Sequence, residues 1–191
     1  MPQPNRTPCS DQVYPIREDT LLLLEAVIGE LKTRDRVLEV GTGSGYIAST
    51  VKTIAPNVIA TDINPHAIQM TREQGIEVVR TDLMDGIRGP FDLVIYNPPY
   101  LPTAEGERIN DWLERALDGG PTGRRVIERF AKEVKRVLSE KGRILLLISS
   151  LTGIETVQEL FSHQGFQGKI IRKIQIEGED LVVLQFRYAG S

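Results

Sequence analysis

The amino-acid sequence predicts an α/β fold: a doubly wound, mostly parallel sheet of seven strands that ends in an antiparallel hairpin. Short apolar runs typical of buried strands alternate with segments of helical periodicity over most of the 191 residues. That alternation is the pattern of a parallel sheet with helices on both faces. The tail carries two further strand-like runs, joined only by residues 177–180. Four residues are too few for a parallel crossover, so these two strands must be antiparallel.

The chain begins with a segment rich in proline, so we expect residues 1–17 to form an extended leader before a core at 18–191. Asp19 and Thr20 carry side-chain oxygens of the kind that cap helix starts, and we expect a helix to begin there. The apolar positions that follow at helical spacing are Leu24, Val27, Ile28 and Leu31.

Apolar runs in the first half of the chain predict strands at 36–40, 58–61 and 76–79. Asn64 and Pro65 are expected to open the helix after the second strand, because asparagine caps a helix and proline fits its first turn. A glycine-rich turn leads from the first strand into a helix with Ile47, Val51 and Ile54 on its inward face.

Residues 91–96 are apolar enough for a buried fourth strand, which two prolines end just after Asn97. Residues 101–122 are polar and rich in glycine, so we expect a loop with one helical turn around Trp112. Trp112 is interpreted as an anchor of this loop, with contact to a substrate as the alternative.

A long helix is expected from Arg124 to Leu138, ended by Gly142, before a fifth strand at 143–148. Its inward positions are Ile127, Phe130, Val134 and Val137. The remaining elements are a helix with Ile154, Val157 and Phe161 inward, which Gly165 ends, and strands at about 166–175 and 181–187.

Length and composition indicate one soluble domain covering residues 1–191. A net charge of −3 argues against a large nucleic-acid footprint. No apolar run approaches the ~20 residues that span a bilayer, and the N-terminus lacks a signal-peptide pattern. The single cysteine, Cys9, cannot form an internal disulfide and is more often incidental than a nucleophile in such a leader. We therefore expect a cytoplasmic protein.

The turn after the first strand carries Gly41, Gly43 and Gly45, which let a backbone approach a ligand closely. A dinucleotide site has the pattern Gly-x-Gly-x-x-Gly, and here Tyr46 takes the last position. Glu39, just before the turn, would repel a pyrophosphate but can accept hydrogen bonds from an ammonium group. S-adenosylmethionine carries an ammonium, a sulfonium and no phosphate, so charge favours it over NAD.

Two carboxylates follow the next two predicted strands. Asp62 stands about 20 residues after the glycines, where a carboxylate meets ribose hydroxyls, and Asp82 can accept from an adenine amino group. The carboxyl ends of parallel strands share one edge of a sheet, so both would face one crevice. Taken singly, Asp62 is also explained as a helix cap and Asp82 as a turn residue.

The sequence Asn97-Pro98-Pro99-Tyr100 predicts a stiff turn at the end of the fourth strand. An amide oxygen, a nearby carbonyl and an aromatic ring can seat a flat –NH₂ group, whose two hydrogens need acceptors. This turn therefore indicates chemistry on a planar nitrogen, and a simple cap for Asn97 is the alternative.

Together these residues resemble class I S-adenosylmethionine-dependent methyltransferases of the HemK type, which have a Rossmann-like fold. The Asn-Pro-Pro-Tyr turn narrows the resemblance to enzymes that methylate exocyclic or amide nitrogens. The leader and the later Gly-Gly segment look like the protein-(glutamine-N5) methyltransferases that modify the Gly-Gly-Gln tripeptide of translation release factors. The segments that carry the resemblance are 14–20, 39–45, 61–65, 81–83, 97–100 and 118–123.

The resemblance implies a role for each matching residue. No metal is expected, because methyl transfer needs none and no grouping of histidine or cysteine suggests one. Asn97 and the Pro98 carbonyl would bind the substrate amide, with Pro99 shaping the turn and Tyr100 the wall. Thr20 would touch the methionine end of the cofactor, Glu39 and Gly41 its amino and carboxylate side, Asp62 its ribose, and Asp82 with the Leu83 backbone its adenine. The full set expected to bind S-adenosylmethionine is Thr20, Glu39, Gly41, Gly43, Gly45, Asp62, Ile63, Asp82, Leu83 and Asn97.

Bacterial members of this group carry a helical N-terminal domain that grips the release factor, and this chain has room only for a short leader and one helix. The short form is similar to the archaeal and eukaryotic branch, whose members pair with a small zinc-binding activator of Trm112 type. The predicted strand at Ile76–Val79 would be a sheet edge without proline or lysine to protect it. We expect a partner chain there, or a self-dimer in its absence.

Other functions stay open at this point. The same turn can seat a flipped base, so a nucleic-acid methyltransferase acting on adenine N6 or guanine N2 is one alternative. Arg124, Arg125 and Arg129 weigh weakly for it, and the absence of a target-recognition domain weighs against it. A protein lysine methyltransferase and a non-enzymatic cofactor-binding scaffold are further alternatives.

Overall fold

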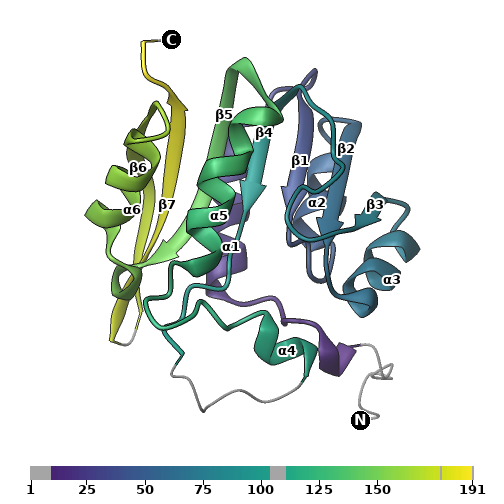
Figure 1. The fold of residues 1–191 in the computed structure, drawn as a ribbon. Coiled ribbons are helices and arrows are strands. Elements are labelled where there is room, and N and C mark those ends of the chain that lie inside the picture. Colours follow the sequence, from purple (N-terminus) through teal and green to yellow (C-terminus); the bar gives the residue numbers. More distant parts are fainter. Residues whose placement is uncertain (1–9, 104–110, 177, 191) are drawn as a thin grey trace.

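The computed structural model describes residues 10–103, 111–176 and 178–190, and it shows a sheet with helices on both faces (Figure 1). The strands of that part of the chain are β1 Arg36–Val40, β2 Asn57–Asp62, β3 Glu77–Arg80, β4 Phe91–Tyr96, β5 Leu138–Ser149, β6 Phe166–Ile176 and β7 Glu179–Tyr188. The α-helices are α1 Glu18–Glu30, α2 Tyr46–Lys52, α3 Pro65–Glu73, α4 Trp112–Arg115, α5 Arg125–Glu133 and α6 Ile154–Ser162. Short 3₁₀ helices lie at Ser10–Gln12, Val134–Arg136 and Ser150–Thr152.

The strands lie in the order β3-β2-β1-β4-β5-β7-β6. The first five pair in parallel, and β7 pairs antiparallel with both β5 and β6. The predicted fold class and the position of β3 at one edge are confirmed. Pairing of β6 with β7 reaches Ile176 and Glu179, so the hairpin turn is shorter than the predicted 177–180.

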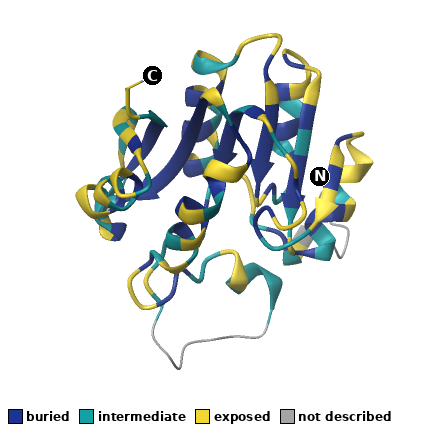
Figure 2. Cartoon of the chain, turned by 45° about the horizontal axis from the view of Figure 1, so that its top comes forward, coloured by how far each residue is buried: buried dark blue, intermediate teal, exposed yellow. Residues whose placement is uncertain are grey.

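The core consists of two apolar clusters, one on each face of the sheet. Helices α1, α2 and α3 contribute Leu23, Val51 and Ile68 to one cluster. Helices α5 and α6 contribute Phe130 and Phe161 to the other. Strands β1, β4, β5 and β7 are buried along most of their length, whereas the edge strands β3 and β6 are mostly not (Figure 2). Because both faces are covered, the sheet is a rigid base for the loops at its ends.

Strand register brings the predicted site residues together. Val40, the last residue of β1, pairs with Thr61 of β2 on one side and with Tyr96 of β4 on the other. The glycine turn, Asp62 and Asn97 follow these three residues directly, so they emerge side by side at one edge of the sheet.

Helix α1 starts without the predicted caps. Arg17 is its N-cap residue and makes no side-chain hydrogen bond to the first turn. Asp19 lies inside that turn and is buried, so the prediction that Asp19 and Thr20 cap the helix is wrong. The helix is also rotated from expectation, because Ile28 faces solvent. Its buried residues are Asp19, Leu22, Leu23, Ala26 and Val27.

Two other helices are shorter than predicted. The helix expected from Arg124 to Leu138 gives way to a 3₁₀ turn, because Leu138 already pairs with Phe91 of β4 at the start of β5. Gly142 therefore lies inside β5 and does not end a helix. Helix α2 ends before Ile54, which is exposed rather than inward.

The described part of the leader is folded onto the core. A 3₁₀ turn at residues 10–12 precedes Val13, which is 4% exposed, so this part is not simply extended as predicted. Cys9 lies outside the described residues. Among the described residues, no helix is both long and apolar enough to cross a membrane.

Candidate functional site

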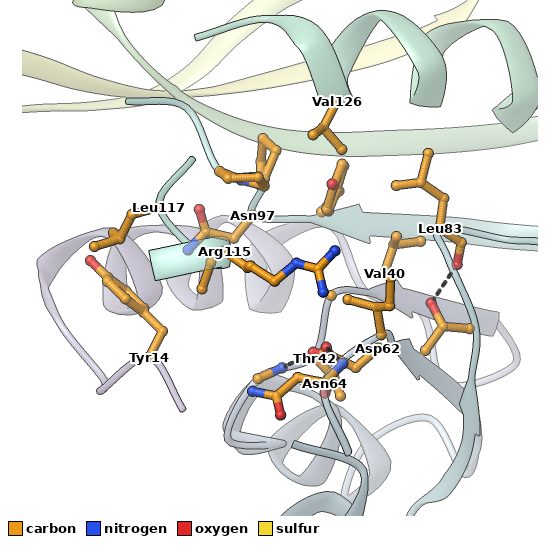
Figure 3. A pocket seen from close by; sticks show the side chains of 18 of the residues that line it. Tyr14, Val40, Thr42, Asp62, Asn64, Leu83, Asn97, Arg115, Leu117 and Val126 are labelled. Atoms are coloured by element: carbon orange, nitrogen blue, oxygen red, sulfur yellow. Dashed lines mark hydrogen bonds between the residues drawn. The ribbon is translucent and has the colours of Figure 1, made fainter. Parts of the chain in front are cut away.

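A pocket of about 300 Å³ lies where β1, β2, β3 and β4 end, the edge that the sequence predicts (Figure 3). This volume is at the lower end of the range for small-molecule sites. Gly45 does not line it, whereas the other predicted site residues do: Thr20, Glu39, Gly41, Gly43, Asp62, Ile63, Asp82, Leu83, Asn97, Pro98, Pro99 and Tyr100.

The glycine turn serves two purposes. Gly43 has a φ of +55°, and a side chain there would point into open space, so its backbone borders the pocket directly. Gly45 has a φ of +77° and packs against α3, where an added Cβ would lie 2.9 Å from Thr71 Oγ1. Gly45 is therefore needed for the contact between the turn and α3, not for ligand approach as predicted.

Glu39 is a buried carboxylate at the base of the pocket. Its Oε2 accepts hydrogen bonds from Thr42 Oγ1 at 2.7 Å and from the N–H of Ala48 at 2.9 Å. Burial raises the pKa of Glu39 to about 8, against an ordinary value of 4.5. A cation in the pocket would favour the charged form of this carboxylate.

Asp62 joins the glycine turn to the loop before α3. Its Oδ2 accepts from the N–H of Gly43 at 2.9 Å, and its Oδ1 accepts from the N–H of Asn64 at 2.8 Å. Burial raises the pKa of Asp62. Asn64 itself caps α3 by accepting from the N–H of His66, as predicted, so the interpretation of Asp62 as a mere helix cap is wrong.

Asp82 and Leu83 form the pocket wall beyond β3. The Asp82 carboxylate pairs with Arg129 at 2.9 Å, and both side chains remain partly exposed. Leu83 has an unusual φ of +49°, and its carbonyl accepts from Thr61 Oγ1 at 2.9 Å. Asp82 therefore has a cation beside it that the sequence did not indicate, and any ligand group must share this carboxylate with Arg129.

The Asn97 amide is held by Asp19, for which the sequence predicted a helix start and no role in the site. Nδ2 of Asn97 donates to Asp19 Oδ2 at 3.1 Å, and the Tyr100 hydroxyl donates to the same oxygen at 3.5 Å. Tyr14, which lines the pocket, also lies near Asp19. Burial, and then the charge of the Asp19 carboxylate, raise the pKa of Tyr14 to about 12. Because a carboxylate only accepts, it fixes the –NH₂ side of the amide toward itself.

That arrangement leaves Asn97 Oδ1 buried and without a hydrogen-bond partner among the described residues. An unsatisfied buried acceptor costs about 1–3 kcal/mol, and such a group in a pocket points to a missing donor. The site thus contains a buried amide oxygen that still needs an N–H donor.

The leader and α4 close one side of the pocket through Gln12. Its carbonyl accepts from Nδ2 of Asn64 at 2.8 Å, and its side-chain Oε1 accepts from the N–H of Trp112 at 3.3 Å. Trp112 lines the pocket, which fits both interpretations made from the sequence. No local pattern in the sequence marks Gln12, because its partners lie 52 and 100 residues away.

The three arginines that gave weak support for a nucleic-acid methyltransferase all make contacts within the chain. Arg124 donates to the Thr152 carbonyl at 2.5 Å. Arg125 pairs with Asp118 at 2.8 Å, and Arg129 pairs with Asp82. These contacts explain the arginines as part of the fold and weaken the case for a nucleic-acid surface.

Residues 16–169 match the family model described as methyltransferase small domain. The chain belongs to the methyltransferase small domain family. The prediction of a methyltransferase, made from the residues and the family they resemble, is confirmed.

Curated relatives of this methyltransferase small domain chain carry more specific names. A Methanocaldococcus jannaschii protein named as a protein N5-glutamine methyltransferase is 36% identical over 180 residues, 91% of this chain and 90% of the relative. Human methyltransferase HEMK2 is 35% identical over 190 residues, 91% and 89% of the two chains. The Deinococcus radiodurans release factor glutamine methyltransferase is 36% identical over 144 residues, 68% of this chain and 52% of its own length. The resemblance to the HemK type is confirmed.

Solved methyltransferase structures share the fold. A chain of the E. cuniculi Mtq2–Trm112 complex, described as responsible for methylation of the eRF1 translation termination factor, has a TM-score of 0.79 and 27% identity. It matches 93% of this chain and 99% of that one. The ribosomal protein L11 methylase of Lactobacillus delbrueckii subsp. bulgaricus has a TM-score of 0.69 at 18% identity, covers 93% and 83% of the two chains, and shows the fold alone.

Proposed function

We propose that this chain transfers a methyl group from S-adenosylmethionine to the side-chain amide of the glutamine in the Gly-Gly-Gln motif of a translation release factor. The observation that carries the proposal is the Asn97 amide, whose Nδ2 is bound by Asp19 and whose Oδ1 has no donor within the part of the chain that the structure describes. A primary amide nitrogen is a matching donor because it has two N–H groups in one plane.

The pocket suits S-adenosylmethionine in charge and composition. Its base carries the buried side chains of Glu39 and Asp62, whose pKa values are raised by burial. A bound cation would favour their charged forms, whereas a pyrophosphate would not. Gly43 leaves space beside the turn for a closely bound ligand. We assign the amino group of the cofactor to Glu39, the ribose to Asp62, and the adenine to the wall formed by Asp82 and Leu83.

The residues of the chain contribute mainly by placement. When bound, S-adenosylmethionine supplies a methyl group on a positively charged sulfur. An amide nitrogen is a poor nucleophile, because its lone pair is delocalised into the carbonyl. Asn97 Oδ1 and the Pro98 carbonyl accept its two N–H groups, which holds the nitrogen still and stabilises the positive charge that grows on it. Positioning of this kind is worth up to ~7–11 kcal/mol in favourable intramolecular cases.

The Asn97 corner must open for the substrate to enter. Oδ1 is closed off from solvent in this structure, while Tyr100 and the leader residue Tyr14 line the pocket around Asp19. We expect a shift of this wall to expose the oxygen while the bond between Nδ2 and Asp19 stays in place. The glutamine side chain then satisfies the unpaired acceptor, so part of the cost of opening is recovered.

A second subunit of Trm112 type is part of the proposal. Strand β3 is an edge of the sheet, and Val79 on it is 38% exposed. An edge strand offers unpaired backbone groups to a partner, and β3 carries neither proline nor lysine to prevent pairing. We place the partner on this edge and expect self-association of the chain without it.

Methyl transfer from radiolabelled S-adenosylmethionine tests the proposed substrate. The chain, alone and with a Trm112-type subunit, is incubated with release factor, DNA, RNA and histone. We expect label on the release factor alone, at the Gly-Gly-Gln glutamine by mass spectrometry, and none on a release factor with alanine at that glutamine. Label on DNA, RNA or a lysine with the release factor unlabelled would favour the alternative functions and refute this one.

A further inference from the structure

Arg115, at the end of α4, is a cation of the pocket that pairs with no carboxylate of the described residues. It lines the pocket, and Figure 3 shows its guanidinium directed inward, between Asn97 and Thr42 in that view. Its guanidinium lies over the Trp112 ring at 5.1 Å from the centroid. A cation held over an aromatic ring keeps its donors available for an anion.

The other described cations of the pocket are already neutralised. Arg125 pairs with Asp118, and Arg129 pairs with Asp82. The remaining charged side chains that line the pocket are carboxylates, namely Asp19, Glu39 and Asp62. An anionic ligand group therefore finds one available cation in this part of the chain, which is Arg115.

Three N–H groups of the glycine turn already have acceptors within the chain, although turns of this kind often bind an anion. The N–H of Gly43 donates to Asp62 Oδ2, the N–H of Thr42 donates to the Thr61 carbonyl, and the N–H of Gly45 donates to the Thr42 carbonyl. These donors would have to break an existing hydrogen bond before they could bind a ligand. Compared with these three N–H groups, Arg115 can bind an anion without breaking a hydrogen bond that the described residues show.

Helix α4 is fixed well enough to present Arg115. Asp111 caps it by accepting from the N–H of Glu114 at 2.9 Å, and the N–H of Trp112 donates to Gln12 of the leader. Arg115 is therefore joined to the pocket wall through Trp112, both by its ring and by its backbone.

We infer that Arg115 binds the carboxylate at the methionine end of S-adenosylmethionine, an inference that rests on the proposed function. The proposed substrate amide is neutral, so this carboxylate is the one anionic group that the reaction brings into the pocket. The ammonium on the same carbon is drawn to Glu39. Arg115 and Glu39 then bind opposite charges of one amino-acid group.

Two ligands that differ only in that group test the inference. S-adenosylhomocysteine carries the amino and carboxylate groups, and 5′-methylthioadenosine keeps the adenosine and the thioether sulfur without them. Affinities are measured by titration calorimetry for the wild-type chain, Arg115→Gln and Arg115→Lys. Arg88→Gln is the control, because Arg88 does not line the pocket. Trp112 is the single tryptophan, so its fluorescence gives a second signal from the residue beneath Arg115.

We expect Arg115→Gln to lower the affinity for S-adenosylhomocysteine by at least about tenfold, the typical loss for a charge-assisted pair. The affinity for methylthioadenosine should stay unchanged. Arg115→Lys should lose less of the affinity for S-adenosylhomocysteine than Arg115→Gln does. The control Arg88→Gln should bind both ligands as the wild type does. Trp112 fluorescence should respond to S-adenosylhomocysteine but not to methylthioadenosine.

Three results would overturn the inference. Equal weakening of both ligands would show that Arg115 only supports the fold of the loop. Unchanged S-adenosylhomocysteine affinity with a raised KM for the release factor would place Arg115 on the protein substrate instead. A wild-type chain that binds neither ligand would overturn the proposed function as well, whereas the first two results would leave it intact.

Discussion

Oδ2 of Asp19 accepts a hydrogen bond from Nδ2 of Asn97 at 3.1 Å, across 78 positions of sequence. Asp19 comes from the first turn of α1, and Asn97 follows the last residue of β4. The bond determines which way the amide faces, because a carboxylate can accept only from the –NH₂ side. The oxygen that is left over is the acceptor on which the proposed chemistry depends.

Asp19→Asn should therefore slow methyl transfer more than it weakens binding of the cofactor. The new amide can donate to Asn97 and turn it round, which removes the directed acceptor. A hydrogen bond to a charged group contributes about 1.5–3 kcal/mol, so kcat should fall by roughly 10- to 100-fold. Single-turnover methyl transfer and S-adenosylhomocysteine titration measure the two effects separately. Glu18→Gln, an exposed neighbour on the same turn, should behave as wild type, and equal losses in both variants would contradict the role of Asp19.

Glu39 predicts a pH dependence of stability. Its pKa is about 8 in the folded chain against an ordinary value of 4.5, so the folded chain holds a proton that the unfolded chain releases between these values. The free energy of unfolding should fall as pH rises from about 4.5 to 8, by up to about 1.4 kcal/mol per pH unit for one proton. Asp62, whose pKa is also raised, contributes in the same direction.

Chemical unfolding at pH 5, 6, 7 and 8 measures this slope. Glu39→Gln should flatten it without removing it, since Asp62 remains. Glu155→Gln on α6 is an exposed control that should keep the wild-type slope. A Glu39→Gln slope identical to that of wild type would mean that Glu39 is charged throughout this range.

Gly43 and Gly45 should respond differently to alanine. Both have positive φ, but a Cβ at Gly45 would meet Thr71 Oγ1 at 2.9 Å, and a Cβ at Gly43 meets nothing within 4 Å. Gly45→Ala should lower the free energy of unfolding by about 1–3 kcal/mol, and Gly43→Ala by about 1 kcal/mol from backbone strain alone. Gly43→Ala should lower the affinity for S-adenosylhomocysteine more than Gly45→Ala does, since Gly43 borders the pocket. Urea unfolding and ligand titration of both variants measure these effects. A larger loss of stability in Gly43→Ala together with a larger loss of affinity in Gly45→Ala would contradict the two roles.

Arg143 supports the fold at the other end of the strands. It is 2% exposed and pairs with Asp35 at 2.5 Å, and it also donates to the Asp92 carbonyl at 3.1 Å. Arg143→Met would leave Asp35 buried without its partner, which typically costs about 3–5 kcal/mol, a large fraction of the about 5–15 kcal/mol that stabilises a domain. The control Arg187→Met removes a more exposed pair with Glu30, which contributes about 0–1 kcal/mol. Similar urea midpoints for the two variants would contradict the structural role of Arg143.

Much of the fold follows from local patterns, because strand and helix periodicities are local properties. The register of β1 with its neighbours then brings Asp62 and Asn97 to one edge without further information. Errors arose where tertiary contacts overrode local preference. Leu138 continues a helical pattern but pairs with Phe91 in the sheet.

The site was predictable as far as its residues follow strand ends. Gly45 has the pattern of a ligand contact, yet its packing against α3 depends on where Thr71 lies. Asp19 and Arg115 were missed as site residues for a similar reason. Asp19 is a residue type common at helix starts, and Arg115 follows a polar loop in the sequence. Only the three-dimensional arrangement brings both side chains to the pocket.

The central claim is that the Asn97 amide positions the substrate nitrogen. Its most direct test is methyl transfer to the release factor by Asn97→Ala, with S-adenosylhomocysteine affinity measured on the same protein. Loss of an acceptor aimed at developing charge typically costs about 10²–10³ in kcat, so we expect transfer to fall by at least that factor while the cofactor analogue still binds. An Asn97→Ala chain that methylates the release factor at the wild-type rate would contradict the account.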